Sequence, residues 1–135
     1  MIEKMITFIG GGNMATAIIS GILSSGLSDC NHICATAAHE SSVIRLKETL
    51  NIEATTDNKA AAQKADILFL AIKPNMFHKV IPEIRHAVKD DAIIVSIAAG
   101  QPIERIEEMF ENSIKLVRVM PNTPAMVGAA MSAIC

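Results

Sequence analysis

Hydrophobic residues occur along this chain in two alternating patterns. Short runs rich in Ile, Val and Phe are apolar at nearly every position, and the longer segments between them carry an apolar residue every three or four positions. The short runs predict strands buried on both faces, and the longer segments predict helices with one buried stripe. This alternation is typical of an α/β fold, so we expect a doubly wound, mainly parallel sheet.

The helical segments have apolar stripes that suit packing on such a sheet. In the first, Met14, Ile18 and Ile22 recur every four residues, and Gly26 is placed to end the helix. Because proline lacks an N–H donor and clashes with the preceding turn, we expect a break at Pro82, which would open a second helical piece. The predicted strands cover residues 5–9, 32–37, 52–55, 66–72, 92–98 and 114–120, and the further helical segments cover residues 43–50, 57–64, 73–88 and 102–110.

The turn after the first predicted strand has the sequence IGGGNMA, at residues 9–15. Gly10, Gly12 and Ala15 match the G-x-G-x-x-[GA] pattern, in which the glycines permit a tight turn and the close approach of a pyrophosphate. The following helix offers free N–H groups to the anion. In this strand, turn and helix context the motif predicts a Rossmann-type domain that binds a dinucleotide, and a purely structural turn is the alternative.

The end of the second predicted strand bears on the choice between NAD and NADP. An acidic residue about 20 positions after the glycine motif usually holds the ribose hydroxyls of NAD. The residues at this tip are Ala37, Ala38 and His39, and Glu40 comes slightly late. The missing carboxylate favours NADP, although the usual arginine is missing too. Residues 39–42 and Arg45 are candidates for holding the ribose phosphate, with an ordinary helix cap as the alternative.

Length and charge narrow the possible functions. The chain has 135 residues, half of them hydrophobic, which suits one domain, and we expect this to be an NAD(P)-binding domain over residues 1–135. Twelve basic residues against 14 acidic ones give no field that would recruit nucleic acid or an anionic membrane. No apolar run approaches the roughly 18 residues of a membrane span, and no signal-peptide pattern is present, which predicts a cytoplasmic location.

The metal-binding residue types give no convincing site. Cys30, Cys34 and Cys135 are an odd number without paired spacing, which predicts reduced thiols. Cys30, His32 and Cys34 are close enough to suggest zinc, but their alternation fits the two faces of a strand better and no second ligand pair exists. We therefore predict no metal site, and no histidine forms a recognisable pair with a nucleophile.

Four segments together resemble the pyrroline-5-carboxylate reductase family: FIGGGNMATAI, DILFLAIKPN, SIAAGQPIERIE and VRVMPNTPAMVGAAMSAI. The resemblance covers essentially the whole chain, and MPNTP is more specific than the glycine motif. It implies an enzyme of proline biosynthesis that reduces the C=N bond of the small molecule 1-pyrroline-5-carboxylate with NADPH or NADH. The alternatives are a non-enzymatic NAD(P)-binding module and another NADP-dependent oxidoreductase of the same fold, against which MPNTP argues.

The resemblance also implies which residues bind the cofactor. Phosphate contacts fall on Gly10, Gly12, Asn13, Met14 and Ala15, and adenosine contacts on Ala37, Ala38, His39 and Asn58. The cofactor cleft and the nicotinamide side correspond to Ala71, Lys73, Pro74, Ala98, Ala99, Gly100 and Asn122. Lys73 as a solvated charge and Asn122 as part of a rigid turn are the alternatives for those two residues.

One departure from the family concerns length. The family's proteins continue into a helical C-terminal domain that forms a homo-oligomer and supplies much of the substrate pocket, and this domain is absent from the chain. We therefore assign no catalytic side chain, and we expect this chain alone to bind cofactor without catalysing the reduction.

Overall fold

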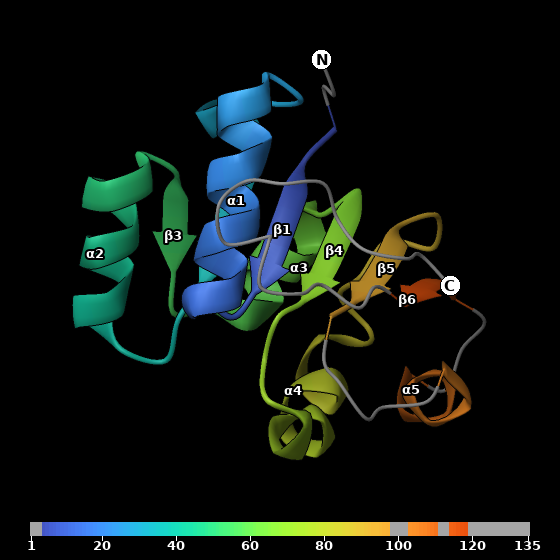
Figure 1. The fold of residues 1–135 in the computed structure, drawn as a ribbon. Helices are drawn as coiled ribbons and strands as arrows, with labels where there is room; N and C mark the ends of the chain where they lie inside the picture. The colour runs from blue at the N-terminus through green and yellow to red at the C-terminus, as the bar shows by residue number, and fades with distance from the viewer. Residues whose placement is uncertain (1–3, 98–102, 111–113, 119–135) are drawn as a thin grey trace.

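In the part of the chain that the structure describes, six parallel strands form one sheet in the order β3-β2-β1-β4-β5-β6 (Figure 1). The computed structural model describes residues 4–97, 103–110 and 114–118. This is the order of a doubly wound α/β fold, so the predicted fold class is confirmed. The strands are β1 (Ile6–Ile9), β2 (Ile33–Thr36), β3 (Glu53–Thr55), β4 (Ile67–Leu70), β5 (Ile93–Ser96) and β6 (Lys115–Arg118).

The helices cover the two faces of the sheet in separate layers. On one face α1 (Asn13–Ser25) and α2 (Glu40–Leu50) enclose a core that includes Phe8 and Phe69, whose rings stack 4.4 Å apart. On the other face lie α3 (Asn58–Lys64), α4 (Phe77–Ile84) and α5 (Ile103–Phe110). Because both faces are covered, β4 and β5 are apolar at almost every position, and both lie inside the sheet.

Helix α1 ends where the sequence predicts. Gly26 has a φ of 74°, a left-handed conformation that glycine adopts without a Cβ clash. Its N–H donates to the Leu23 carbonyl, and the N–H of Leu27 donates to the Ile22 carbonyl at 3.2 Å. These two bonds satisfy carbonyls that the helix end would otherwise leave unpaired, so Gly26 is a genuine stop signal.

The predicted break at Pro82 is wrong, because α4 continues through Pro82 to Ile84. Four side chains of this helix are buried against the sheet: Phe77, Val80, Ile81 and Ile84. Pro82 itself is exposed, so its ring points away from this packed stripe. The proline removes the N–H that would bond to the His78 carbonyl, and burial of the apolar stripe outweighs that loss.

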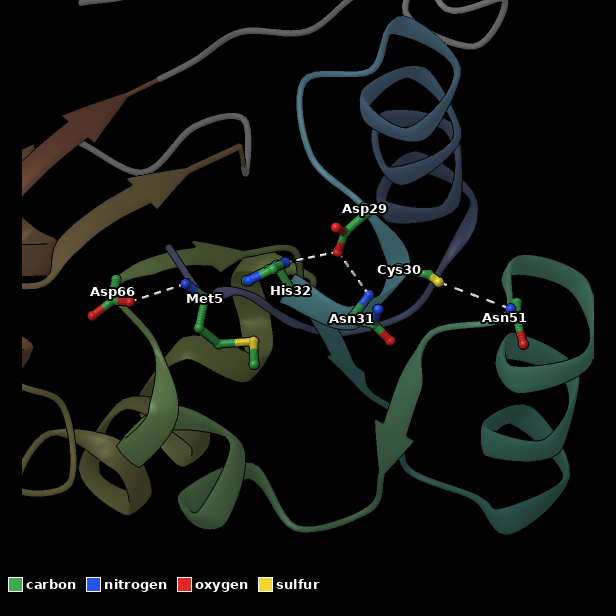
Figure 2. Close-up of polar contacts among 7 residues, drawn as sticks. All are labelled: Met5, Asp29, Cys30, Asn31, His32, Asn51 and Asp66. Atoms are coloured by element: carbon green, nitrogen blue, oxygen red, sulfur yellow. Dashed lines mark hydrogen bonds and ion pairs between the residues drawn. The ribbon is translucent and has the colours of Figure 1, made fainter. Parts of the chain in front are cut away.

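Polar contacts tie together the edge of the sheet at which the strands begin (Figure 2). The Met5 N–H donates to Asp66 Oδ2 at 2.9 Å, which links the start of β1 to the start of β4. Lys89 forms an ion pair with the other oxygen of Asp66, also at 2.9 Å. A single carboxylate thus joins three separate segments at this edge.

The proposed strand alternation of Cys30, His32 and Cys34 is only partly right. Cys30 and His32 lie in a 3-10 turn, η1 (Cys30–His32), and only Cys34 belongs to β2. His32 Nδ1 lies 2.7 Å from the Asp29 carboxylate, and Asn51 donates to Cys30 Sγ (Figure 2). Within the described ranges no three His, Cys, Asp or Glu side chains gather as a metal site would require. None of the described helices has the length and apolar character to cross a membrane.

Candidate cofactor-binding site

The backbone conformation at position 10 requires glycine. Its φ is 107°, and a Cβ at this position would come within 2.6 Å of the Ala71 carbonyl oxygen. The Ala71 N–H also donates to the Ile9 carbonyl at 2.9 Å. Any side chain on Gly10 would therefore push apart the carboxyl ends of β1 and β4.

Gly12 is free of such contacts. Its φ of −77° suits any residue, and a Cβ there would meet no heavy atom within 4 Å. Gly12 is also the N-cap of α1, no side chain caps this helix, and the first turn holds no acidic residue. The open space at Gly12 and the uncapped N–H groups together form a cradle that fits a phosphate group.

The residues after Gly12 differ in their exposure. Asn13 is exposed, Met14 is half-buried, and Ala15 is only 1% exposed. Because Ala15 packs in the core of the α1 face, a small side chain there allows the helix to lie close to the sheet. Asn13 and Met14 present their backbone at the helix N-terminus, beside the open space at Gly12.

Two residues that hold the glycine turn in place were not predicted from the sequence. The Thr36 hydroxyl, at the end of β2, accepts a hydrogen bond from the Gly10 N–H at 3.0 Å. Leu46 of α2 lies under Gly11, where an added Cβ would come within 2.6 Å of Leu46 Cδ1. The hydrogen bond from Gly10 could have been expected, because Thr36 is a polar residue that ends an otherwise apolar strand and is buried there.

The predicted adenosine-side residues lie at the carboxyl end of β2. Ala37 is half-buried and its N–H donates to the Thr55 carbonyl at 3.1 Å, whereas Ala38 and His39 are exposed. His39 is the N-cap of α2, but its side chain makes no capping hydrogen bond. Glu40 places a carboxylate in the first turn of α2, which disfavours a phosphate at that helix end.

The remaining described candidates follow β3 and β4 at the same edge of the sheet. Asn58 is the first residue of α3, which is capped by the Asp57 carboxylate. Ala71 contacts the Gly10 position, Lys73 is exposed, and Pro74 begins a 3-10 turn, η2 (Pro74–Met76). Because all six strands are parallel, these positions share the carboxyl edge with the glycine turn. The other candidates, Ala98, Ala99, Gly100 and Asn122, lie outside the described residues.

Strand order, glycine turn and uncapped α1 together define a Rossmann-type dinucleotide-binding domain. The family described as "NADP oxidoreductase coenzyme F420-dependent" matches residues 5–100, and the chain belongs to this family.

Relatives of known name support the resemblance seen in the motifs. The pyrroline-5-carboxylate reductase of Vibrio alginolyticus is 40% identical over 98% of this chain and 48% of that protein. The enzyme of the same name from Escherichia coli K12 is 38% identical over 98% of this chain and 49% of that protein. The resemblance to pyrroline-5-carboxylate reductases is confirmed, and the chain spans about half the length of these relatives.

Solved structures give the same result. A pyrroline-5-carboxylate reductase from Coxiella burnetii superposes with a TM-score of 0.87 and 35% identity, over 93% of this chain and 47% of that one. The Plasmodium falciparum pyrroline carboxylate reductase, solved with NADP bound, superposes with a TM-score of 0.82 and 26% identity, over 94% of this chain and 45% of that one.

Proposed function

We propose that residues 1–135 form the NAD(P)-binding domain of a pyrroline-5-carboxylate reductase, with NADPH as the preferred cofactor and NADH as a possible one. The 40% identity over 98% of the chain to a reductase of that name carries the choice of reaction. The open position at Gly12, at the uncapped N-terminus of α1, supports the cofactor assignment independently of any relative.

The chain's own residues would hold the cofactor in an extended position along the carboxyl edge of the sheet. Gly12 and the α1 N-terminus would bind the pyrophosphate, and residues 37–39 with Asn58 would border the adenosine. Ala71, Lys73 and Pro74 would line the way to the nicotinamide, with Ala98, Ala99, Gly100 and Asn122 next to the reacting carbon. A reduced nicotinamide supplies the hydride that converts the C=N bond of 1-pyrroline-5-carboxylate to the amine of L-proline.

We assign binding and positioning to this chain, and no catalytic side chain. The wider assignments are also proposals: 1-pyrroline-5-carboxylate as the small-molecule substrate, a homo-oligomer formed outside this domain, and no nucleic-acid or membrane partner. A cytoplasmic location is supported by the two described cysteines, Cys30 and Cys34, which are both free thiols.

The experiment is a titration of the chain with NADPH and NADH, together with an assay of 1-pyrroline-5-carboxylate reduction. We expect NADPH to bind and the chain alone to give no turnover, because it spans about half the length of its relatives. The same titration on a full-length protein should show both binding and reduction. Failure of both cofactors to bind this chain and the full-length protein would contradict the proposal.

A second candidate is a cofactor-binding module without reductase activity, because the described residues form a phosphate cradle to which no catalytic side chain is assigned. Binding without reduction by the full-length protein as well would support this candidate over the reductase.

A further inference from the structure

Arg45 of α2 extends to the glycine turn. Its Nη2 donates to the Gly11 carbonyl oxygen at 3.4 Å, and this is the hydrogen bond its guanidinium makes within the described part of the chain. The residue is exposed, and such a long bond is weak. An arginine carries five N–H donors, so most of its capacity to bind an anion remains available at this position.

The contacts around Arg45 place its charge beside the end of β2. Leu46, the next residue, packs under Gly11, so α2 is in van der Waals contact with the glycine turn. An added Cβ on Gly11 would also lie 3.2 Å from the Thr36 carbonyl, the last residue of β2. In folds of this kind the adenosine ribose binds at the carboxyl end of β2, so the Arg45 guanidinium lies at the ribose side of the turn.

His39 is the one basic side chain in the segment between β2 and Arg45. Residues 37–44 contain neither lysine nor arginine, and Glu40 adds a negative charge in the first turn of α2. Arg45 is therefore the first lysine or arginine after β2, and it already contacts the turn that precedes the pyrophosphate cradle.

We propose that Arg45 binds the 2′-phosphate of NADPH and gives this chain its preference for NADPH over NADH, an inference that rests on the proposed function. On binding, the guanidinium exchanges its weak bond to the Gly11 carbonyl for two charge-assisted bonds to phosphate oxygens. Planar guanidinium and phosphate match in a bidentate geometry that lysine does not reproduce.

The test compares binding of NADPH and NADH to the wild-type chain and to Arg45→Gln, Arg45→Lys and Lys47→Gln. Lys47 is an exposed cation on the same helix, so its replacement removes one charge without touching the turn. The chain has no tryptophan or tyrosine, which leaves cofactor fluorescence free of their emission. Circular dichroism checks that each variant is folded.

We expect Arg45→Gln to weaken NADPH binding by about tenfold to a hundredfold and to leave NADH binding within about twofold. Arg45→Lys should recover part of the loss, and Lys47→Gln should change the ratio of the two affinities little. An equal loss for both cofactors would overturn the assignment, because it would place Arg45 at the pyrophosphate or in the support of the turn. Unchanged NADPH binding would also overturn it. If neither the wild-type chain nor the full-length protein binds either cofactor, the proposed function fails first, and this inference fails with it.

Discussion

At the scale of single residues, two glycines of one motif lie in different surroundings. Gly10 is fixed by the backbone, since its positive φ and the nearby Ala71 carbonyl exclude a side chain. Gly12 meets no protein atom, so nothing in the fold itself requires glycine there. The need for glycine at position 10 arises from folding, and under the proposed function a need for glycine at position 12 would arise from the cofactor.

This difference predicts opposite effects for two substitutions. Gly10→Ala should lower the free energy of unfolding by about 3 kcal/mol, because it adds backbone strain and a clash with Ala71. Gly12→Val should change that free energy by less than about 1 kcal/mol and should abolish NADPH binding, because its side chain occupies the phosphate cradle. Urea unfolding and cofactor titration measure the two effects. Normal cofactor affinity in Gly12→Val would refute the cradle.

A second pair of substitutions concerns two buried hydroxyls at the carboxyl edge. Ser96 is fully buried, and its Oγ has no hydrogen-bond partner in the described structure, whereas the Thr36 hydroxyl accepts from the Gly10 N–H. We expect Ser96→Ala to raise the free energy of unfolding by about 1 kcal/mol and Thr36→Val to lower it by about 1–2 kcal/mol. Thermal and urea unfolding of both variants provide the comparison. A clear loss of stability in Ser96→Ala would mean that its hydroxyl is paired.

At the scale of elements, the behaviour of α4 shows where local rules are overridden. Phe77, Ile81 and Ile84 are fully buried, so the helix is held by its packed stripe. Pro82 costs one backbone hydrogen bond on the exposed side. The helix thus tolerates a residue that an isolated helix would reject.

We expect Pro82→Ala to stabilise the protein by about 1–2 kcal/mol, since a new N–H can bond to the His78 carbonyl and alanine favours the helix. The gain is smaller than the full helix penalty of proline, because proline also restricts the unfolded chain. Glu83→Ala is the control, as this exposed neighbour already has its N–H. Urea unfolding curves measure the difference, and a less stable Pro82→Ala would show that the proline ring itself contributes packing.

The sequence predicts the order and type of elements well, because strand and helix periodicities are local properties. It also predicts the glycine turn and the Gly26 stop, which depend on backbone conformations that glycine favours. The Thr36 hydroxyl bond and the Leu46 contact join segments far apart in the chain, so no local pattern reports them. The predicted helix break at Pro82 was wrong for the same reason, because burial of the apolar stripe against distant segments keeps α4 continuous.

At the scale of the whole molecule, the two edges of the sheet have separate roles. The carboxyl edge carries the glycine turn and those predicted cofactor residues that the structure describes. The opposite edge carries the Asp66 carboxylate, which accepts a hydrogen bond from the Met5 N–H (Figure 2). The same carboxylate also forms an ion pair with the Lys89 ammonium. Changes at Asp66 should therefore alter stability without altering cofactor contacts.

The hydrogen bond from Lys89, followed by that from the Met5 N–H, holds the pKa of the Asp66 carboxyl below its ordinary value of 3.8. Because the folded-state pKa is the lower one, these contacts stabilise the protein above pH 3.8, and the stabilisation is lost as the pH falls through the folded-state pKa. Asp66→Asn should lower the Tm at neutral pH and reduce the fall of Tm with acid below about pH 4.

Asp91→Asn is the matched control, since Asp91 is exposed and forms no ion pair within the described residues. Thermal melts of wild type and both variants from neutral to acidic pH give the comparison, and NADPH titration at neutral pH should give equal affinities for all three. If Asp66→Asn melts at the wild-type temperature throughout, the links to Met5 and Lys89 contribute nothing to stability. If it loses NADPH affinity while it remains folded, the two edges of the sheet are coupled, and the separation of their roles is wrong.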